Sequence, residues 1–190
     1  MAFNITNFIG SMGSDGARPN LFTISIGMVG NLERFRFRAK ASSIPGSRVG
    51  VAPAFYFGRQ AKFAGNRVFD DWTVTVLVDE GDFGAGPRYH LELWAALLNS
   101  HNGNIRTTNY VSPASYMTDG TVVQYAKNGV ALATYDMIGC FPIDISPIGL
   151  DWGANDTIEE FTVTFAMQYW ASTASKVVDN PVPSNPGTSA

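Results

Sequence analysis

Residues 161–170 read Phe-Thr-Val-Thr-Phe-Ala-Met-Gln-Tyr-Trp, and this stretch decides the fold class. Every second position carries a large apolar side chain: Phe161, Val163, Phe165, Met167 and Tyr169. Side chains of a β-strand alternate between the two faces of a sheet, so the pattern predicts a long, half-buried antiparallel strand. A strand this regular, in a chain poor in catalytic residue types, favours a structural β protein.

The same alternation predicts further strands outward from this one. Apolar and polar side chains alternate over residues 22–28, 34–41 and 72–78. The tripeptide Lys127-Asn128-Gly129, between the apolar runs 121–126 and 130–137, is typical of a β-hairpin turn. These segments predict six to eight antiparallel strands.

One convincing helix is expected, and it follows Pro87. Proline suits the first turn of a helix, and the apolar residues that follow are spaced i, i+3, i+4, i+7. They are Leu91, Trp94, Ala95 and Leu98. The predicted fold is therefore mainly β, an antiparallel β-barrel or sandwich with one flanking α-helix.

The chain divides into three parts by composition. Residues 1–17 form a Gly/Ser-rich arm with a short apolar cluster, which we expect to be ordered against a partner. Residues 18–170 form the β domain, and residues 171–190 form a flexible tail rich in Ser, Pro and Asn. Within the domain, the prolines and glycines of residues 42–60 predict a long extended loop. Its exposed aromatic tip favours association with another protein surface.

Composition excludes several classes of protein. The formal net charge of −3 provides no basic field for nucleic acid. Cys140 is the single cysteine, so neither an intrachain disulfide nor a cysteine metal site is expected, as in a protein made in a reducing cytoplasm. No signal peptide and no apolar run of ~20 residues is visible, which predicts a soluble protein without a membrane anchor.

The chain carries few residues suited to chemistry. Its two histidines, His90 and His101, fall on the predicted helix and at its end, where solvent-exposed positions are the simplest interpretation. The nucleophile pattern G-x-S-x-G is missing, and Cys140 is interpreted as a buried thiol. The acidic, Gly-rich turn at 79–86 matches neither a phosphate loop nor a calcium loop. We therefore predict no catalytic, cofactor or metal site.

A basic stripe is the one clear charge pattern, and it comprises Arg34, Arg36, Arg38 and Lys40. It is either a solvent face that discourages wrong edge pairing or a contact face between subunits. In the second interpretation it meets acidic residues of a neighbour, such as Glu159 and Glu160. Nucleic-acid binding ranks third because no stacking platform accompanies the stripe.

Several segments together resemble the tail tube proteins of contractile-tailed bacteriophages of the T-even-like, myovirus type. The strongest reads Ala-Gly-Asn-Arg-Val-Phe-Asp-Asp-Trp-Thr-Val-Thr-Val at residues 64–76. Others are Ala-Arg-Pro-Asn-Leu-Phe at 17–22, Lys-Ala at 40–41, Gln-Tyr at 124–125, Leu-Asp-Trp at 150–152 and the closing strand. They span about residues 17–170 in family order.

The resemblance implies six-membered rings that stack into a hollow tube inside a contractile sheath, assembled in the host cytoplasm and carried in the virion. It implies as partners other copies of the chain, the tail sheath protein, a baseplate tube-initiator, a tail terminator and a tape measure protein in the lumen. DNA passes through without specific binding, along a wall that we expect to be neutral to acidic.

In such a tube we expect the loop to contact the next ring through Pro45, Val49, Phe55, Tyr56 and Phe57. The basic stripe, with Glu159 and Glu160, is expected to contact a neighbouring subunit. A baseplate tube-initiator or a ring protein of a type six secretion system would have the same fold and is the alternative. A small β-barrel enzyme or carbohydrate-binding module is a third hypothesis, disfavoured by the lack of a His/Asp/Glu constellation.

Overall fold

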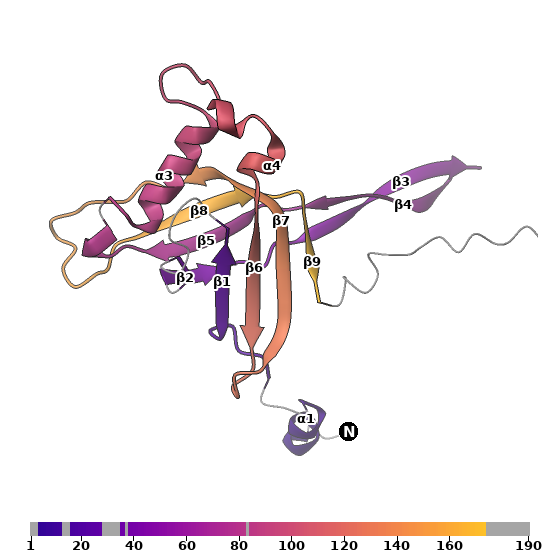
Figure 1. Ribbon diagram of the computed structural model, residues 1–190. Helices are drawn as coiled ribbons and strands as arrows, with labels where there is room; N and C mark the ends of the chain where they lie inside the picture. Colours follow the sequence, from indigo (N-terminus) through magenta and orange to yellow (C-terminus); the bar gives the residue numbers. More distant parts are fainter. Residues whose placement is uncertain (1–3, 13–15, 28–34, 37, 83, 174–190) are drawn as a thin grey trace, which may run out of the picture.

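The computed structural model describes residues 4–12, 16–27, 35–36, 38–82 and 84–173 (Figure 1). A seven-stranded antiparallel sheet has the order β1-β6-β7-β8-β5-β2, with β9 also paired to β7, and β3 pairs with β4 as a separate hairpin. The strands are β1 Phe22–Ile26, β2 Ala39–Ser42, β3 Ser47–Tyr56, β4 Arg59–Phe69, β5 Trp72–Leu77, β6 Thr118–Tyr125, β7 Ala131–Ile145, β8 Glu160–Ala166 and β9 Tyr169–Ser172. The mainly β prediction is confirmed.

Strand β7 divides the sheet into two halves because it bends in the middle. Its first part pairs with β6 and β9, and its last part, from Phe141 to Ile145, pairs with β8. The bend lies at Gly139, whose φ of 68° belongs to the left-handed region that glycine adopts without strain. The Gly139 N–H, freed from the ladder, donates to Asp119 Oδ1 at 2.9 Å.

The strand predicted at residues 161–170 is divided because β7 bends. We predicted one continuous strand over residues 161–170, but β8 ends at Ala166 and β9 begins at Tyr169. The reason is that β8 pairs with the second half of β7 and β9 with the first half, so the chain must turn between them. The N–H of Gln168 in this turn donates to the Ile138 carbonyl.

The core forms where the predicted alternation places it. Phe161, Val163 and Phe165 of β8 are buried, as are Trp72, Val74 and Val76 of the adjacent strand β5. The intervening threonines remain half-buried on the opposite face, which we call the threonine face and which comprises Thr73, Thr75, Thr162 and Thr164. Helix α3, Pro87–Leu98, covers the buried side, and its Trp94 ring lies 6.2 Å from the Phe165 ring. Its predicted position is confirmed.

The expectation of a single helix is wrong for the described residues. Helix α1 spans Ile5–Met12 in the predicted arm, and α4 spans Pro113–Tyr116, with short 3₁₀ turns η1 at Glu80–Asp82 and η2 at Thr108–Tyr110. In α1, the spacing of Ile5, Phe8, Ile9 and Met12 is amphipathic, a signal that could have identified the helix. None of the described helices combines the length and apolarity needed to span a membrane.

Two other segments differ from their predicted structure. The predicted loop at 42–60 is mostly a β-hairpin, because β3 and β4 pair along their length with a two-residue turn at Phe57-Gly58. The predicted strand at 34–41 is shorter: β2 begins at Ala39, and Phe35, Arg36 and Arg38 are helical. Phe35 is buried in the core, which explains why this segment leaves the sheet. Arg34 and Phe37 lie outside the described residues.

Replacing Gly120 should test how closely β6 approaches β5. A Cβ atom there would lie 2.5 Å from Cζ3 of Trp72. The Trp72 ring is fully buried, so it cannot turn outward into solvent to relieve the clash. We expect Gly120→Ala to lower the free energy of unfolding by about 2 kcal/mol through overpacking. The matched control is Gly149→Ala, where the new Cβ meets nothing within 4 Å. Equal urea midpoints for the two variants would contradict this close approach.

Candidate assembly surfaces

The residues considered for chemistry do not come together. His90 is half-buried with its ring 5.4 Å from that of Tyr89, and His101 is exposed in the turn after α3. Across the described part of the chain, no group of three or more His, Cys, Asp or Glu side chains could hold a metal ion. Cys140 is buried beside the bend of β7, and its Sγ donates to the Met137 carbonyl. Burial raises the pKa of its thiol to about 12.

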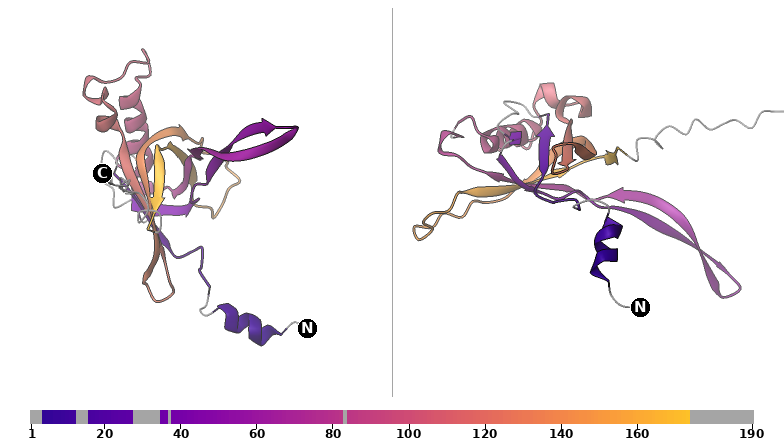
Figure 2. Two further views of the ribbon diagram at one scale, coloured as in Figure 1. Left: turned by 90° about the vertical axis from the view of Figure 1, so that its right-hand side faces the viewer. Right: turned by 90° about the horizontal axis from the view of Figure 1, so that it is seen from below.

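A prominent exposed surface of the described chain is the hairpin of β3 and β4, which we call the projecting hairpin. It extends away from the bent sheet (Figures 1 and 2), and its base contacts β9 through the Phe69 ring, whose centroid lies 6.4 Å from that of Tyr169 and 6.2 Å from that of Trp170. Apolar side chains that are more than half exposed lie along both strands: Val49, Val51, Phe55, Tyr56, Phe63 and Val68. A two-stranded ribbon is only marginally stable in water, so a surface of this kind requires a partner.

The tip of the projecting hairpin has a costly conformation. Phe57 has a φ of 45° and Gly58 a φ of 74°, as both central residues of a tight I′-type turn require. Asn or Gly is the usual residue at the first position, because a bulky side chain is strained there. Phe57 is nonetheless present and 89% exposed. Its ring contacts the neighbouring Tyr56 ring, with 4.5 Å between centroids. A strained and exposed aromatic residue of this kind favours a role in contact with another molecule.

The structure separates the five residues predicted to contact the next ring. Val49, Phe55, Tyr56 and Phe57 are exposed on the projecting hairpin. Pro45, in contrast, is buried at the hairpin base. The adjacent Gly46 carbonyl accepts the N–H of Asp70 at 3.0 Å, and this hydrogen bond closes the base. Pro45 is therefore covered within its own chain, and its contact with the next ring stays a prediction.

Two residues of the basic stripe have partners in their own chain. Lys40 on β2 pairs with Glu160 on β8, and Arg38 pairs with both Asp79 and Asp82 of the turn at η1. Asp82 is buried and also accepts the N–H of Asp79. No neighbouring subunit is needed to explain these pairs. Arg36 is exposed, Glu159 is half-buried, and their contact with another subunit stays a prediction.

An acidic surface lies at the other end of β5 from the projecting hairpin. We call it the acidic end, and it comprises segments 78–82, 84–86 and 146–160 with the first turn of α3. Its loop before β8 carries Leu150, Trp152 and Ile158, all more than two-thirds exposed. From the sequence, its parts are considered separately: the turn at 79–86 matches no binding motif, and Glu159 and Glu160 are expected to contact the basic stripe of a neighbour. The two segments are about 70 residues apart and meet only in the fold.

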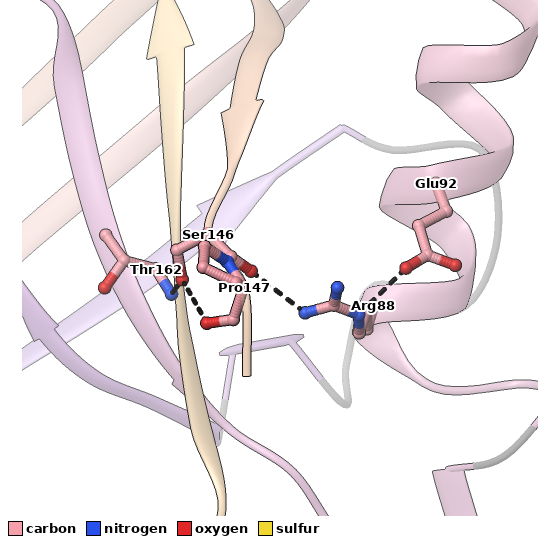
Figure 3. Close-up of polar contacts among 5 residues, drawn as sticks. All are labelled: Arg88, Glu92, Ser146, Pro147 and Thr162. Atoms are coloured by element: carbon pink, nitrogen blue, oxygen red, sulfur yellow. Dashed lines mark hydrogen bonds and ion pairs between the residues drawn. The ribbon is translucent and has the colours of Figure 1, made fainter. Parts of the chain in front are cut away.

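A cavity of about 400 Å³ opens in the acidic end beside α3. Its wall is held by Arg88, whose Nε donates to Glu92 Oε1 and whose guanidinium donates to the Ser146 carbonyl (Figure 3). The hydroxyl of Ser146 accepts the N–H of Thr162, so this network joins α3 to the end of β7 and to β8. The guanidinium also lies 5.3 Å from the centroid of the Phe161 ring.

Comparison with known proteins shows where this fold occurs. Structurally, the chain is similar to a chain of the anti-feeding prophage baseplate, with a TM-score of 0.61 and 14% identity over 84% of this chain and 96% of that one. A chain of the sheath-tube complex of an extracellular contractile injection system, PVC, gives a TM-score of 0.58 and 14% identity, covering 90% and 98%. These likenesses define a fold class that the chain shares with components of these two assemblies.

Sequence relatives define the family within that class. The profile of the family described as phage tail tube protein matches residues 5–173. Tail tube protein gp19 of Enterobacteria phage T4 is 34% identical over 157 residues, covering 82% of this chain and 91% of that protein. The chain therefore belongs to the phage tail tube protein family. It is a structural, non-enzymatic component of a contractile phage tail.

The buried thiol gives a test of the core at the bend of β7. Only the thiolate reacts with disulfide reagents, and a pKa of about 12 keeps Cys140 protonated at pH 8. We expect native protein to react more slowly than denatured protein by a factor on the order of 100 or more. Since the thiol of the unfolded chain ionises near pH 9, raising the pH above that value should favour unfolding. Rapid reaction of native protein would show that the bend opens.

Proposed function

We propose that this protein forms six-membered rings that stack head to tail into the inner tube of a contractile phage tail, through which DNA leaves the particle. The observation that carries the proposal is the projecting hairpin, a ribbon that exposes apolar side chains along both of its strands. Membership of the tail tube family supports a tubular assembly as that partner. Head-to-tail contacts that do not close on themselves produce tubes and filaments.

The open strands support assembly within a ring. β1 and β2 are the two ends of the strand order, and β9 is paired on one side only. Exposed strand edges invite pairing with another chain, and a protein that must stay soluble normally protects them. Pairing of these edges between neighbouring subunits would complete a continuous sheet around the channel.

The proposed partners outside the ring are the tail sheath protein, a baseplate tube-initiator, a tail terminator and a tape measure protein in the lumen. Their support comes from the assemblies in which similar chains occur, which include a sheath-tube complex, a sheath/tube terminator and a baseplate. A tube-initiator of the baseplate is the alternative function. The identity of 34% to a tail tube protein favours the tube subunit itself.

Changing the hairpin tip should separate folding from assembly. We expect the variant Phe55→Ser, Phe57→Asn to fold at least as stably as the wild type, because Asn-Gly is the preferred pair for this turn. The same variant should not elongate into tubes, since the exposed apolar tip is lost. Tube length, grown from preformed baseplates and measured by negative-stain electron microscopy, gives the readout.

The matched control for the hairpin tip is Val130→Ser, a similarly exposed apolar residue beside the turn of the β6–β7 hairpin. Its tubes should reach normal length. Normal tubes from the Phe55, Phe57 variant would remove the projecting hairpin from the contact between rings.

We further propose that the threonine face lines the channel. Its hydroxyl groups carry no charge, and the Thr75 and Thr162 oxygens lie 3.4 Å apart across β5 and β8. The nearby charges of Lys40 and Glu160 neutralise each other. A wall of this kind lets a polyanion slide, because each phosphate held by a cation would release counterions and add drag.

Adding a cation to the threonine face should slow DNA ejection. We expect Thr162→Lys to give tubes that bind DNA in a salt-sensitive way and particles that eject DNA more slowly, because lysines would repeat around every ring. The control is Asn109→Lys in η2, which adds the same charge at an exposed position outside this face. Equal ejection rates for the two variants would place the channel elsewhere. Tight, salt-sensitive DNA binding by the wild-type subunit would contradict a neutral wall.

A further inference from the structure

We propose that the acidic end of one subunit is the receptor for the projecting hairpin of a subunit in the adjacent ring, with the aromatic tip seated in the cavity beside α3. The occupant is a second copy of this chain. This inference rests on the proposed stacking of rings and names the surface that receives the hairpin.

The positions of the two surfaces suit head-to-tail stacking. β4 leads through Asp70 and Asp71 directly into β5, so the projecting hairpin leaves the body at the first residue of β5. The acidic end begins after the last residue of β5, Leu77, and includes Glu160, the residue of β8 that pairs with Leu77. The hairpin and the loop before β8 extend in opposite directions from the body (Figures 1 and 2). A heterologous contact repeated along an axis must join opposite ends of the subunit.

The two surfaces have opposite charge. Residues 47–69 contain four basic side chains and no acidic one, namely Arg48, Arg59, Lys62 and Arg67. Residues 78–86 and 146–160 contain seven acidic side chains and no basic one, namely Asp79, Glu80, Asp82, Asp151, Asp156, Glu159 and Glu160. The first turn of α3 adds Arg88, whose charge is paired with that of Glu92. The chain as a whole has a net charge of −3, so this separation is local. Complementary charges of this kind steer association and fix register.

Charges remain available on both surfaces after the pairs within the chain are formed. Arg48 pairs with Asp70 at the hairpin base, but Arg59 and Lys62 make no ion pair with any described residue. On the acidic end, Arg38 forms ion pairs with Asp79 and Asp82, and Lys40 forms one with Glu160. Glu159 has no such partner in the described chain and lines both the cavity beside α3 and the two hollows next to it.

The cavity has the chemistry to receive the tip. Val78, Ile148 and Leu150 give its wall an apolar part. Arg88, fixed by Glu92 and the Ser146 carbonyl, presents a guanidinium at its side, a group that packs on aromatic faces. Phe57 is the most exposed aromatic side chain of the projecting hairpin and is held outward by the strained turn. Its ring enters the cavity while Arg59, two residues on, approaches Glu159.

A charge swap tests this pairing in the full-length protein. Arg59→Glu alone and Glu159→Arg alone should each reduce the length of tubes grown from baseplates at least tenfold, because each brings like charges together. The double variant, with both substitutions in every subunit, should restore growth. Lys127→Glu, a charge reversal at the β6–β7 turn, is the control and should leave tube length unchanged.

The outcomes separate this inference from the proposed function. If wild-type tubes grow but the double variant grows no better than the single variants, or if the single variants grow normally, the acidic end is not the receptor. If wild-type protein forms neither rings nor tubes, the proposed function fails and this inference fails with it. Should Glu159→Arg fail to fold by circular dichroism, Glu80→Arg, an exposed position on the same surface, replaces it in the swap.

Discussion

The arrangement of both halves of the sheet depends on the indole ring of Trp72. The ring centroid lies 5.4 Å from that of Phe165 on β8, and the ring leaves no room for a side chain at Gly120 on β6. The indole N–H donates to Ser42 Oγ at the end of β2, at 2.9 Å. Because Trp72 is also the first residue of β5, the same contact fixes the point from which the projecting hairpin leaves the body.

The residues that stabilise the monomer are different from those that remain exposed for assembly. The core around Trp72 and Phe165 is buried without any neighbour, and the body charges of Arg38 and Lys40 are paired internally. Exposed apolar groups and available charges lie mainly at the extremities, on the projecting hairpin, on α1 and at the acidic end. In the proposed tube, ordering of the marginally stable hairpin is coupled to docking, which favours growth on a template over spontaneous association.

Prediction from sequence was most successful where a pattern is local. The strand at 72–78, the part of the predicted strand at 161–170 that forms β8, the turn at Lys127-Asn128-Gly129 and the helix after Pro87 lie where local patterns place them. The loop at 42–60 was misjudged because its prolines and glycines conceal a strand pair formed with residues that follow it. The acidic end was missed because segments about 70 residues apart form it, and no local pattern reports that distance.

The fold class, the core faces of β5 and β8, and the family follow from the amino-acid sequence, because alternation and motif order are properties of consecutive residues. The tertiary structure decided the rest. It placed the bend at Gly139, broke the closing strand into β8 and β9, buried Pro45, and paired Lys40 with Glu160. It also set a basic hairpin and an acidic end at opposite ends of one strand. These features depend on which distant segments pack together, since both burial and Coulomb attraction act through space and not along the chain.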